Sequence, residues 1–258
     1  MKPILLIDTA SPHCAVALVL ENDLLLRTSE QERQSAQKAL PLVESLLDDA
    51  GISQTQLGAI GVVSGPGSFT GMRIGVAIAQ GLGFANQIPV VPISSLAALA
   101  FSSGTEHLRE MALPEEGLKE GTSAENWLAI IPAREQEYYI GAYRVSNQMA
   151  AADKSGCVAS APTLHTLIPD QVLQEEDFAA LVAKLLKLAE PSSYAICSSQ
   201  TLPDSLLQST VHSAAALRVS PEISMQSLSI LVQQALESGA EYDPSSALPN
   251  YVKEQMNY

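Results

Sequence analysis

The sequence has few cysteines and few positive charges, and each shortage excludes a class of protein. The three cysteines, Cys14, Cys157 and Cys197, lie far apart and form no Cys-x-x-Cys pair. This usage favours reduced thiols over a disulfide scaffold or a structural zinc site. Only 14 Lys and Arg stand against 28 Asp and Glu, which gives a formal net charge of −14. Because nucleic-acid capture depends on cations that neutralise phosphates, strong direct binding to nucleic acid is not expected.

Long uninterrupted apolar runs are also missing. The N-terminal MKPILLID reaches Asp8 too early for the apolar core of a secretory signal peptide. No charge occurs between Arg73 and Glu106, but prolines and polar side chains interrupt that stretch too often for a membrane-spanning helix. We therefore expect a cytoplasmic protein that does not bind membranes.

Familiar catalytic patterns are absent as well. The four histidines are isolated in the sequence and form no H-E-x-x-H pair, so a zinc hydrolase is disfavoured. The serine-hydrolase turn G-x-S-x-G fails around Ser68, where Pro66 and Thr70 occupy the glycine positions. We expect no catalytic residue, no bound metal and no cofactor.

The residues that are present predict an α/β layer in the first hundred positions. With 258 residues, 47% of them hydrophobic, the chain is long enough for one large domain or two small ones. Apolar runs predict strands, whereas apolar residues with a period near 3.6 predict helices. The expected strands are 4–8, 13–20, 24–28, 59–63 and 89–93, and the expected helices are 35–51, 70–85 and 95–101.

A polar, acidic and turn-rich stretch at 102–126 predicts a domain boundary. We place an N-terminal α/β domain at 1–103 and a C-terminal α/β domain at 104–258. In the second domain we expect strands at 127–131, 137–145, 194–198 and 216–220, and helices at 176–189 and 223–239. Helix 223–239 is also a candidate for packing back on the first domain.

The glycine-rich segment SGPGSFTGMRIG (64–75) lies between a predicted strand and a predicted helix, where many proteins hold phosphate. A P-loop would need a Lys, and a dinucleotide fingerprint would need glycine where Thr70 stands. A tight turn with Ser68 or Thr70 as helix N-cap fits better. Within the helix, small residues recur every four positions on one face: Gly71, Gly75, Ala79 and Gly83. Interior glycine costs about 1 kcal/mol relative to alanine, so this stripe indicates close packing, either on the chain's own sheet or on a second protein chain.

Two segments resemble known families. ILLIDTASPHCAVAL (4–18) resembles the first phosphate loop of the sugar-kinase, actin and heat-shock-chaperone superfamily. GPGSFTGMRIGVAIAQGLG (65–83) is similar to the signature of the TsaB family, and shorter matches occur at 35–43, 133–139 and in the P-x-Y-V-K ending at 249–253. The resemblance is dense over roughly the first hundred residues and implies a two-lobed, actin-like fold of ribonuclease-H-like domains.

The resemblance to TsaB implies a non-catalytic subunit. TsaB is a paralogue of TsaD, and with TsaD and the ATPase TsaE it serves in transferring the threonylcarbamoyl group to adenosine in tRNA. The resemblance therefore implies a TsaD-like catalytic partner, a TsaE-like ATPase and a homodimer when the chain is alone. Helices 35–50 and 70–84 would form the partner face, with these candidates: Leu42, Val43, Leu46, Gly71, Gly75 and Ala79. Asp8, Thr9 and Ser11 would be the remnant of a phosphate loop.

The sequence departs from the catalytic members of the superfamily. Ala10 stands where active kinases have glycine two residues after the aspartate, and the segment QSAQKALP (34–41) has no His-x-x-x-His metal pair of the TsaD type. An ATP-dependent phosphotransferase of the same superfamily remains an alternative, as does a metallopeptidase, and these departures disfavour both.

Overall fold

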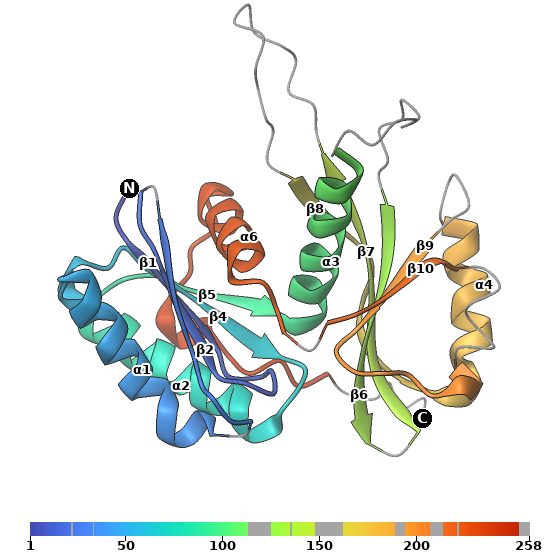
Figure 1. Cartoon of the computed structure of the whole chain (residues 1–258), viewed down its shortest axis with the longest axis horizontal. Coiled ribbons are helices and arrows are strands. Elements are labelled where there is room, and N and C mark those ends of the chain that lie inside the picture. Colours follow the sequence, from blue (N-terminus) through green and yellow to red (C-terminus); the bar gives the residue numbers. More distant parts are fainter. Residues whose placement is uncertain are drawn as a thin grey trace, which may run out of the picture. The chain divides into compact units, whose positions relative to one another are not determined.

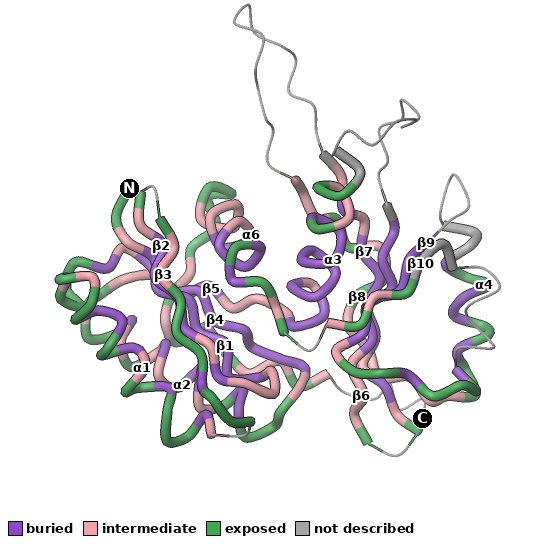
Figure 2. The backbone as a smooth tube through the Cα atoms, in the orientation of Figure 1, coloured by how far each residue is buried: buried purple, intermediate pink, exposed green. Residues whose placement is uncertain are grey.

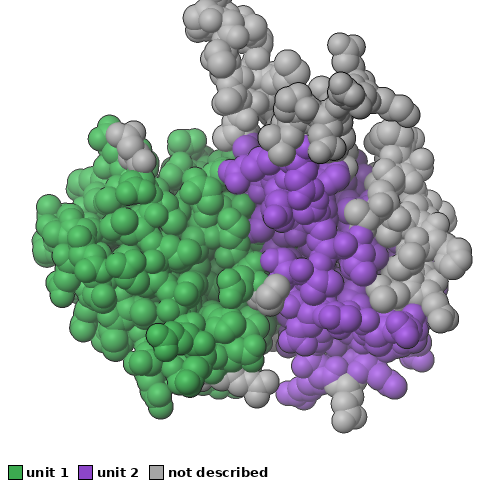
Figure 3. Space-filling view, in the orientation of Figure 1, with its two compact units in different colours: residues 1–98, 221–252 green, residues 99–220, 253–258 purple. Residues whose placement is uncertain are grey.

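The chain forms two compact units. The computed structural model describes residues 1–21, 23–32, 34–112, 125–134, 136–147, 162–188, 194–206, 214–220 and 222–252. One unit comprises residues 1–98 and 221–252, and the other comprises 99–220 with 253–258 (Figure 3). The expected domains were 1–103 and 104–258, so the difference lies mainly in the C-terminal segment, which returns to the first unit.

The first unit is built on a mixed five-stranded sheet. Its strands are β1 (Ile4–Asp8), β2 (Ala15–Val19), β3 (Leu24–Thr28), β4 (Ala59–Gly65) and β5 (Val90–Ser94). Their order is β3-β2-β1-β4-β5, in which β2 is antiparallel to both β1 and β3. The other side of β1 pairs in parallel with β4, and β4 pairs in parallel with β5. Pro92 is tolerated because β5 is an edge strand.

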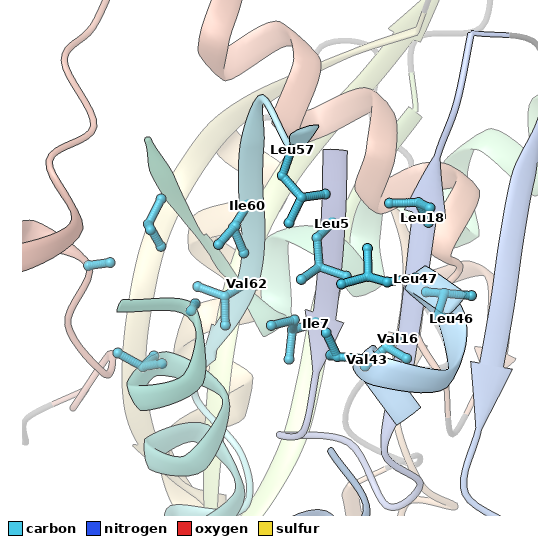
Figure 4. Close-up of a cluster of buried hydrophobic side chains, with 14 residues drawn as sticks. Leu5, Ile7, Val16, Leu18, Val43, Leu46, Leu47, Leu57, Ile60 and Val62 are labelled. Carbon is cyan, nitrogen blue, oxygen red and sulfur yellow. The ribbon is translucent and has the colours of Figure 1, made fainter. Parts of the chain in front are cut away.

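Three helices cover the two faces of this sheet: α1 (Ser35–Ala50), α2 (Phe69–Asn86) and α6 (Met225–Glu237) (Figure 1). Alternate strand residues such as Leu5 and Ile7 point toward α1 and α2 and form one buried cluster with Leu46 (Figure 4). Side chains alternate across a strand, so the intervening residues face α6. At Gly61 the fit is close, because a Cβ there would overlap the side chain of Val232 on α6.

The second unit repeats this plan. Its strands are β6 (Glu125–Arg134), β7 (Glu137–Asn147), β8 (Pro162–Gln174), β9 (Tyr194–Ser198) and β10 (Ala214–Val219), in the order β10-β9-β6-β7-β8. Helix α4 (Phe178–Leu188) packs one face of this sheet into a buried cluster that contains Leu128 and Ile130. On the intervening positions, Trp127 and Val145 lie against Gly104 of α3 (Ser95–Ala112).

The two sheets have the same topology. In each, the first strand is central, the next two follow in antiparallel order on one side, and the last two follow in parallel order on the other. No repeat of fixed period is visible in the sequence, because topology constrains only the pattern of buried residues. The predicted two-lobed α/β fold is confirmed.

Two elements differ from the sequence-based expectation. Helix α3 continues to Ala112 instead of ending near 101, so part of the predicted boundary 102–126 is helical, and 113–124 lies outside the described residues. Strand β8 was not predicted at all. It contains Pro169, which argues against a central strand, and β8 tolerates the proline because it lies at the edge of the sheet. The other predicted elements are present within a few residues of their expected bounds.

Along α1 and α2, buried residues lie on the side that packs against the sheet and exposed residues lie on the other side, as the apolar spacing predicts (Figure 2). Cys14 and Cys197 are buried free thiols, and Cys157 lies outside the described residues. Within the described ranges, no helix is both long enough and apolar enough to cross a bilayer.

Candidate functional site at the glycine-rich turn and helix α2

The turn between β4 and α2 is a capped helix start. Gly65 has a φ of +106°, a conformation that favours glycine. Ser68 is the N-cap residue, and its Oγ accepts a hydrogen bond from the backbone N–H of Gly71 at 3.1 Å. Of the two N-cap candidates, Ser68 is therefore the one that caps the helix.

The chain's own β1–β2 loop occupies the space at the N-terminus of α2. The backbone N–H of Ser68 donates to the carbonyl of Ala10 at 3.1 Å, and the Thr9 hydroxyl donates to the carbonyl of Gly71 at 2.7 Å. A Cβ at Gly71 would overlap the Thr9 carbonyl oxygen, which also accepts a hydrogen bond from Ser35 of α1. The β1–β2 loop therefore packs against the first turn of α2, and the Ala10 carbonyl takes up the Ser68 N–H, one of the donors that a phosphate at this helix N-terminus would use, whereas residues 68–70 themselves stay exposed.

Asp8, at the end of β1, stabilises the β1–β2 loop through hydrogen bonds. Its carboxylate is buried, and Oδ1 accepts hydrogen bonds from the N–H groups of Ala10 at 2.9 Å and Ser11 at 3.1 Å. Burial raises the pKa of Asp8 above its ordinary value, an effect that the hydrogen bonds of Ser11 and Ala10 oppose and the charge of Glu222 reinforces. The three predicted phosphate-loop residues, Asp8, Thr9 and Ser11, thus meet around one loop and are used to brace it.

The neighbouring Cys14 adds no reactive group to this loop. Burial, with a contribution from Asp8, raises the pKa of the Cys14 thiol to about 11, so the thiol is protonated at neutral pH. His13 Nδ1 lies 3.0 Å from Glu222 Oε1, which ties the loop to the returning C-terminal segment of the same unit. Among the described residues, no group of three His, Cys, Asp or Glu side chains is arranged to hold a metal ion.

The glycine stripe of α2 faces the interior of its own unit. A Cβ at Gly75 would overlap the Thr9 hydroxyl, and one at Gly83 would overlap Val90 and lie 3.0 Å from Pro244. Ala79 is fully buried in the same core. Packing on the chain's own sheet and loop therefore explains why these positions are small.

For the same reason, most of the predicted partner residues lie inside the unit and not on its surface. Val43 and Leu46 of α1 point into the core between α1 and the sheet (Figure 4). Leu42 is partly buried against the same cluster. Gly71, Gly75 and Ala79 are also buried. A partner could reach these five buried residues only if the packing of the unit opened.

The outward face of α2 carries a second set of small and apolar residues. Ala77 and Gly81 are exposed, and no atom lies within 4 Å of a Cβ placed at Gly81. Phe69 and Phe84, on the same helix, are 56% and 57% exposed. The sequence analysis did not single out this outward face, because the stripe from Gly71 to Gly83 already accounted for the glycines of the helix. The available signal was Gly81, which lies two residues, or about 200°, from that stripe.

We predict a pH-dependent effect of replacing Asp8 with asparagine. A folded-state pKa above the ordinary value of 3.8 means that Asp8 contributes most to stability below that pH, and that this contribution is lost as the pH rises through the folded-state pKa. The asparagine carbonyl can still accept the bonds from Ala10 and Ser11 but does not ionise. The unfolding free energy of the wild type should therefore fall relative to that of D8N as the pH rises from acidic to neutral.

Urea denaturation of both proteins at a series of pH values tests this prediction. Asp243→Asn is the control, because exposed Asp243 has a lowered pKa through its hydrogen bonds to Ser245, and its difference from wild type should run in the opposite direction. A wild-type-to-D8N difference that does not change with pH would contradict the prediction.

The comparisons with known proteins agree on one family. The family described as TsaD, tRNA N6-adenosine threonylcarbamoyltransferase, matches residues 27–179. The tRNA threonylcarbamoyladenosine biosynthesis protein TsaB of Haemophilus influenzae is 35% identical over 136 residues, covering 53% of this chain and 51% of that protein. The protein of the same name from Escherichia coli is 35% identical over 141 residues, covering 55% and 54%. The match thus spans about half the length of these curated relatives.

A solved structure extends the similarity over nearly the whole chain. YeaZ from Pseudomonas aeruginosa superposes with a TM-score of 0.70 at 28% sequence identity and covers 97% of this chain and 100% of that one. A second crystal structure from the same organism, described as an uncharacterized protein with similarity to peptidase YEAZ, gives a TM-score of 0.71 at 28% identity, covering 98% and 100%.

Proposed function

We propose, on the premise that this chain belongs to the TsaD family and within it to the TsaB proteins, that it takes part in the synthesis of threonylcarbamoyladenosine in tRNA. The names of its curated relatives support this role, and so does the resemblance of the segment 65–83 to the TsaB signature. We place this synthesis in the cytoplasm, where tRNA is modified.

We further propose that the chain is a non-catalytic subunit. The observation that carries this proposal is that acceptors of the chain itself take up N–H groups at the start of α2, the Ala10 carbonyl that of Ser68 and the Ser68 hydroxyl that of Gly71. A phosphate that used these two donors would have to displace the β1–β2 loop, which the buried Asp8 braces. The chain then serves a TsaD-type catalytic partner, which supplies the transfer chemistry, and a TsaE-type ATPase.

The outward face of α2 is the surface we assign to the catalytic partner. Small side chains let two helices approach closely, and this geometry does not depend on the solvent. Ala77 and Gly81 provide such positions, and none of the residues that the structure describes requires Gly81 to lack a side chain. On α1, which packs beside α2, Leu40 is 46% exposed. In the absence of the partner, a second copy of the chain would cover the same face.

Replacing Gly81 with leucine should weaken association with the TsaD-type protein of the same genome at least about tenfold, since a helix packed closely at this point would meet the new side chain. The isolated variant should fold normally, because the site is open in the free chain. Calorimetric titration of the two purified proteins measures the association.

Ala183→Leu is the matched control, because Ala183 is exposed on α4 in the other unit. It should bind like the wild type. If the wild type does not bind the TsaD-type protein at all, the proposed function fails. If wild type and G81L bind equally, only the assignment of the surface fails.

The rival function, an ATP-dependent phosphotransferase, predicts tight binding of Mg-ATP by the isolated chain. The acceptors already bonded to the N–H groups of Ser68 and Gly71 at the start of α2 disfavour it. Titration with Mg-ATP tests this directly, and tight stoichiometric binding would restore the phosphotransferase and overturn the non-catalytic assignment.

A further inference from the structure

Two sequence motifs that lie far apart in the chain meet on the surface of the first unit. Arg73 belongs to the glycine-rich segment GPGSFTGMRIG, and Tyr251 belongs to the P-x-Y-V-K ending. In the structure, Nε of Arg73 donates a hydrogen bond of 2.6 Å to the Tyr251 hydroxyl. The proposed non-catalytic role does not by itself assign a function to Arg73 or Tyr251.

Tyr251 is held in place by a well-anchored segment, residues 243–252, which we call the C-terminal strap. Gln80 of α2 donates to the carbonyl of Ala247 at 2.9 Å, and the side chain of Ala247 is fully buried in the core. The backbone N–H of Asn250 donates to the carbonyl of Ser64 at the end of β4, at 2.8 Å. The strap therefore brings Tyr251 to the first turns of α2 without relying on Arg73 alone.

Arg73 contacts two exposed aromatic rings that also lie close to each other. Its guanidinium carbon is 3.6 Å from the centroid of the Phe69 ring and 5.3 Å from that of Tyr251, and the two ring centroids are 5.9 Å apart. Phe69 is 56% exposed and Tyr251 is 45% exposed. We call these three residues the aromatic–arginine stack. The contact with the Phe69 ring and the hydrogen bond from Nε to Tyr251 restrain the guanidinium, so its remaining donors are oriented before any ligand arrives.

The guanidinium of Arg73 still has donors to offer. Within the described part of the chain, Arg73 forms no ion pair and its two terminal nitrogens have no acceptor. The contrast with other arginines is clear, since Arg27 pairs with Asp49 and Arg218 pairs with Glu106 and Glu110. In a chain with two acidic residues for each basic one, an exposed arginine without an acidic partner is available to an external carboxylate.

The position and composition of the stack favour a protein ligand over RNA. Phe69, Arg73, Ala77 and Gly81 are spaced four residues apart and so form one row along the outward face of α2. Tyrosine and arginine are enriched at the residues that dominate binding energy in protein interfaces. A polyanion would be repelled by the net charge of −14, whereas a single carboxylate among apolar side chains would meet two parallel N–H donors.

We propose that the aromatic–arginine stack is the anchor of the partner surface, and that it receives a carboxylate from a helix of the catalytic subunit. This inference rests on the proposed function, because it takes the partner from there. The C-terminal strap thereby becomes part of the binding site, since it supplies one of the three residues of the anchor.

The experiment measures association of the full-length chain with the purified TsaD-type protein of the same genome. Tyr251→Ala and Arg73→Gln should each weaken binding about thirtyfold, the size expected for residues that dominate an interface. Tyr251→Phe keeps the ring but loses the hydrogen bond to Arg73, and its loss should be smaller. Thermal melts of the free variants verify that each is folded.

Two matched variants serve as controls. Lys184→Gln removes one exposed positive charge on α4, as R73Q does on α2, and Leu217→Ala shortens an exposed side chain on β10 of the other unit. Both should bind within about threefold of wild type. The anchor is refuted if Y251A and R73Q, both folded, bind like wild type, or if they instead lower binding of unmodified tRNA in a fluorescence titration. Failure of the wild type itself to bind would refute the proposed function and, with it, the anchor.

Discussion

Replacing Gly71 with alanine should lower the free energy of unfolding by about 2–3 kcal/mol, the cost of forcing atoms into a packed interior. The new methyl group would overlap the carbonyl oxygen of Thr9, and this atom cannot rotate away because it belongs to the backbone. Relieving the overlap would shift the β1–β2 loop and disturb the hydrogen bonds from Thr9 to Gly71 and from Ser68 to Ala10. Urea denaturation followed by far-UV circular dichroism measures the loss.

Gly81→Ala in the same helix is the control. It adds the same methyl group where no atom lies within 4 Å, so it should raise the free energy of unfolding by about 0.8–1 kcal/mol, the helix propensity of alanine over glycine. Equal effects of the two substitutions would contradict the packing described for the stripe, because propensity alone does not distinguish the two positions.

A chain that ends at Ser220 should lose the cooperative unfolding of its first unit. The missing segment contains α6, whose buried apolar side chains, Met225, Leu228, Leu231 and Val232, lie in that unit. At about 1.5–3 kcal/mol for each buried side chain, their loss removes roughly 6–12 kcal/mol, which is comparable to the whole stability of a typical domain.

The single tryptophan makes the result specific to one unit. Trp127 is buried in the second unit, so its fluorescence should keep a native-like spectrum in the shortened chain while the ellipticity of the first unit falls. Adding a peptide of residues 221–252 should restore that ellipticity. Full ellipticity without the peptide would show that the first unit does not need its C-terminal segment.

Much of the fold could be predicted from local patterns. The runs at 4–7 and 59–63 are apolar without interruption because both faces of a central strand are buried. The Ser68 cap is a local feature, since it needs only a hydroxyl placed three residues before an unpaired N–H. Strand β8 escaped because Pro169 is unfavourable in any strand except one at an edge, and no local pattern tells which strand lies at an edge.

The candidate site shows where local reasoning ends. The spacing of Gly71, Gly75, Ala79 and Gly83 determined that one side of α2 is packed closely, because four-residue spacing places side chains on one face. The spacing could not tell what packs there. That depends on the β1–β2 loop, about 60 residues away in the sequence, whose Thr9 contacts two of these glycines.

The sequence by itself determined the alternating elements of an α/β chain, the capped turn, the acidic balance and the resemblance to TsaB, because each of these depends on neighbouring residues or on composition. Only the tertiary structure decided that the conspicuous glycines face inward, that Ala77 and Gly81 face outward, and that Tyr251 joins Arg73 across 178 positions. The physical reason is that a helix has two faces with the same periodicity, and the sheet and the C-terminal strap that pack against it select which one is buried.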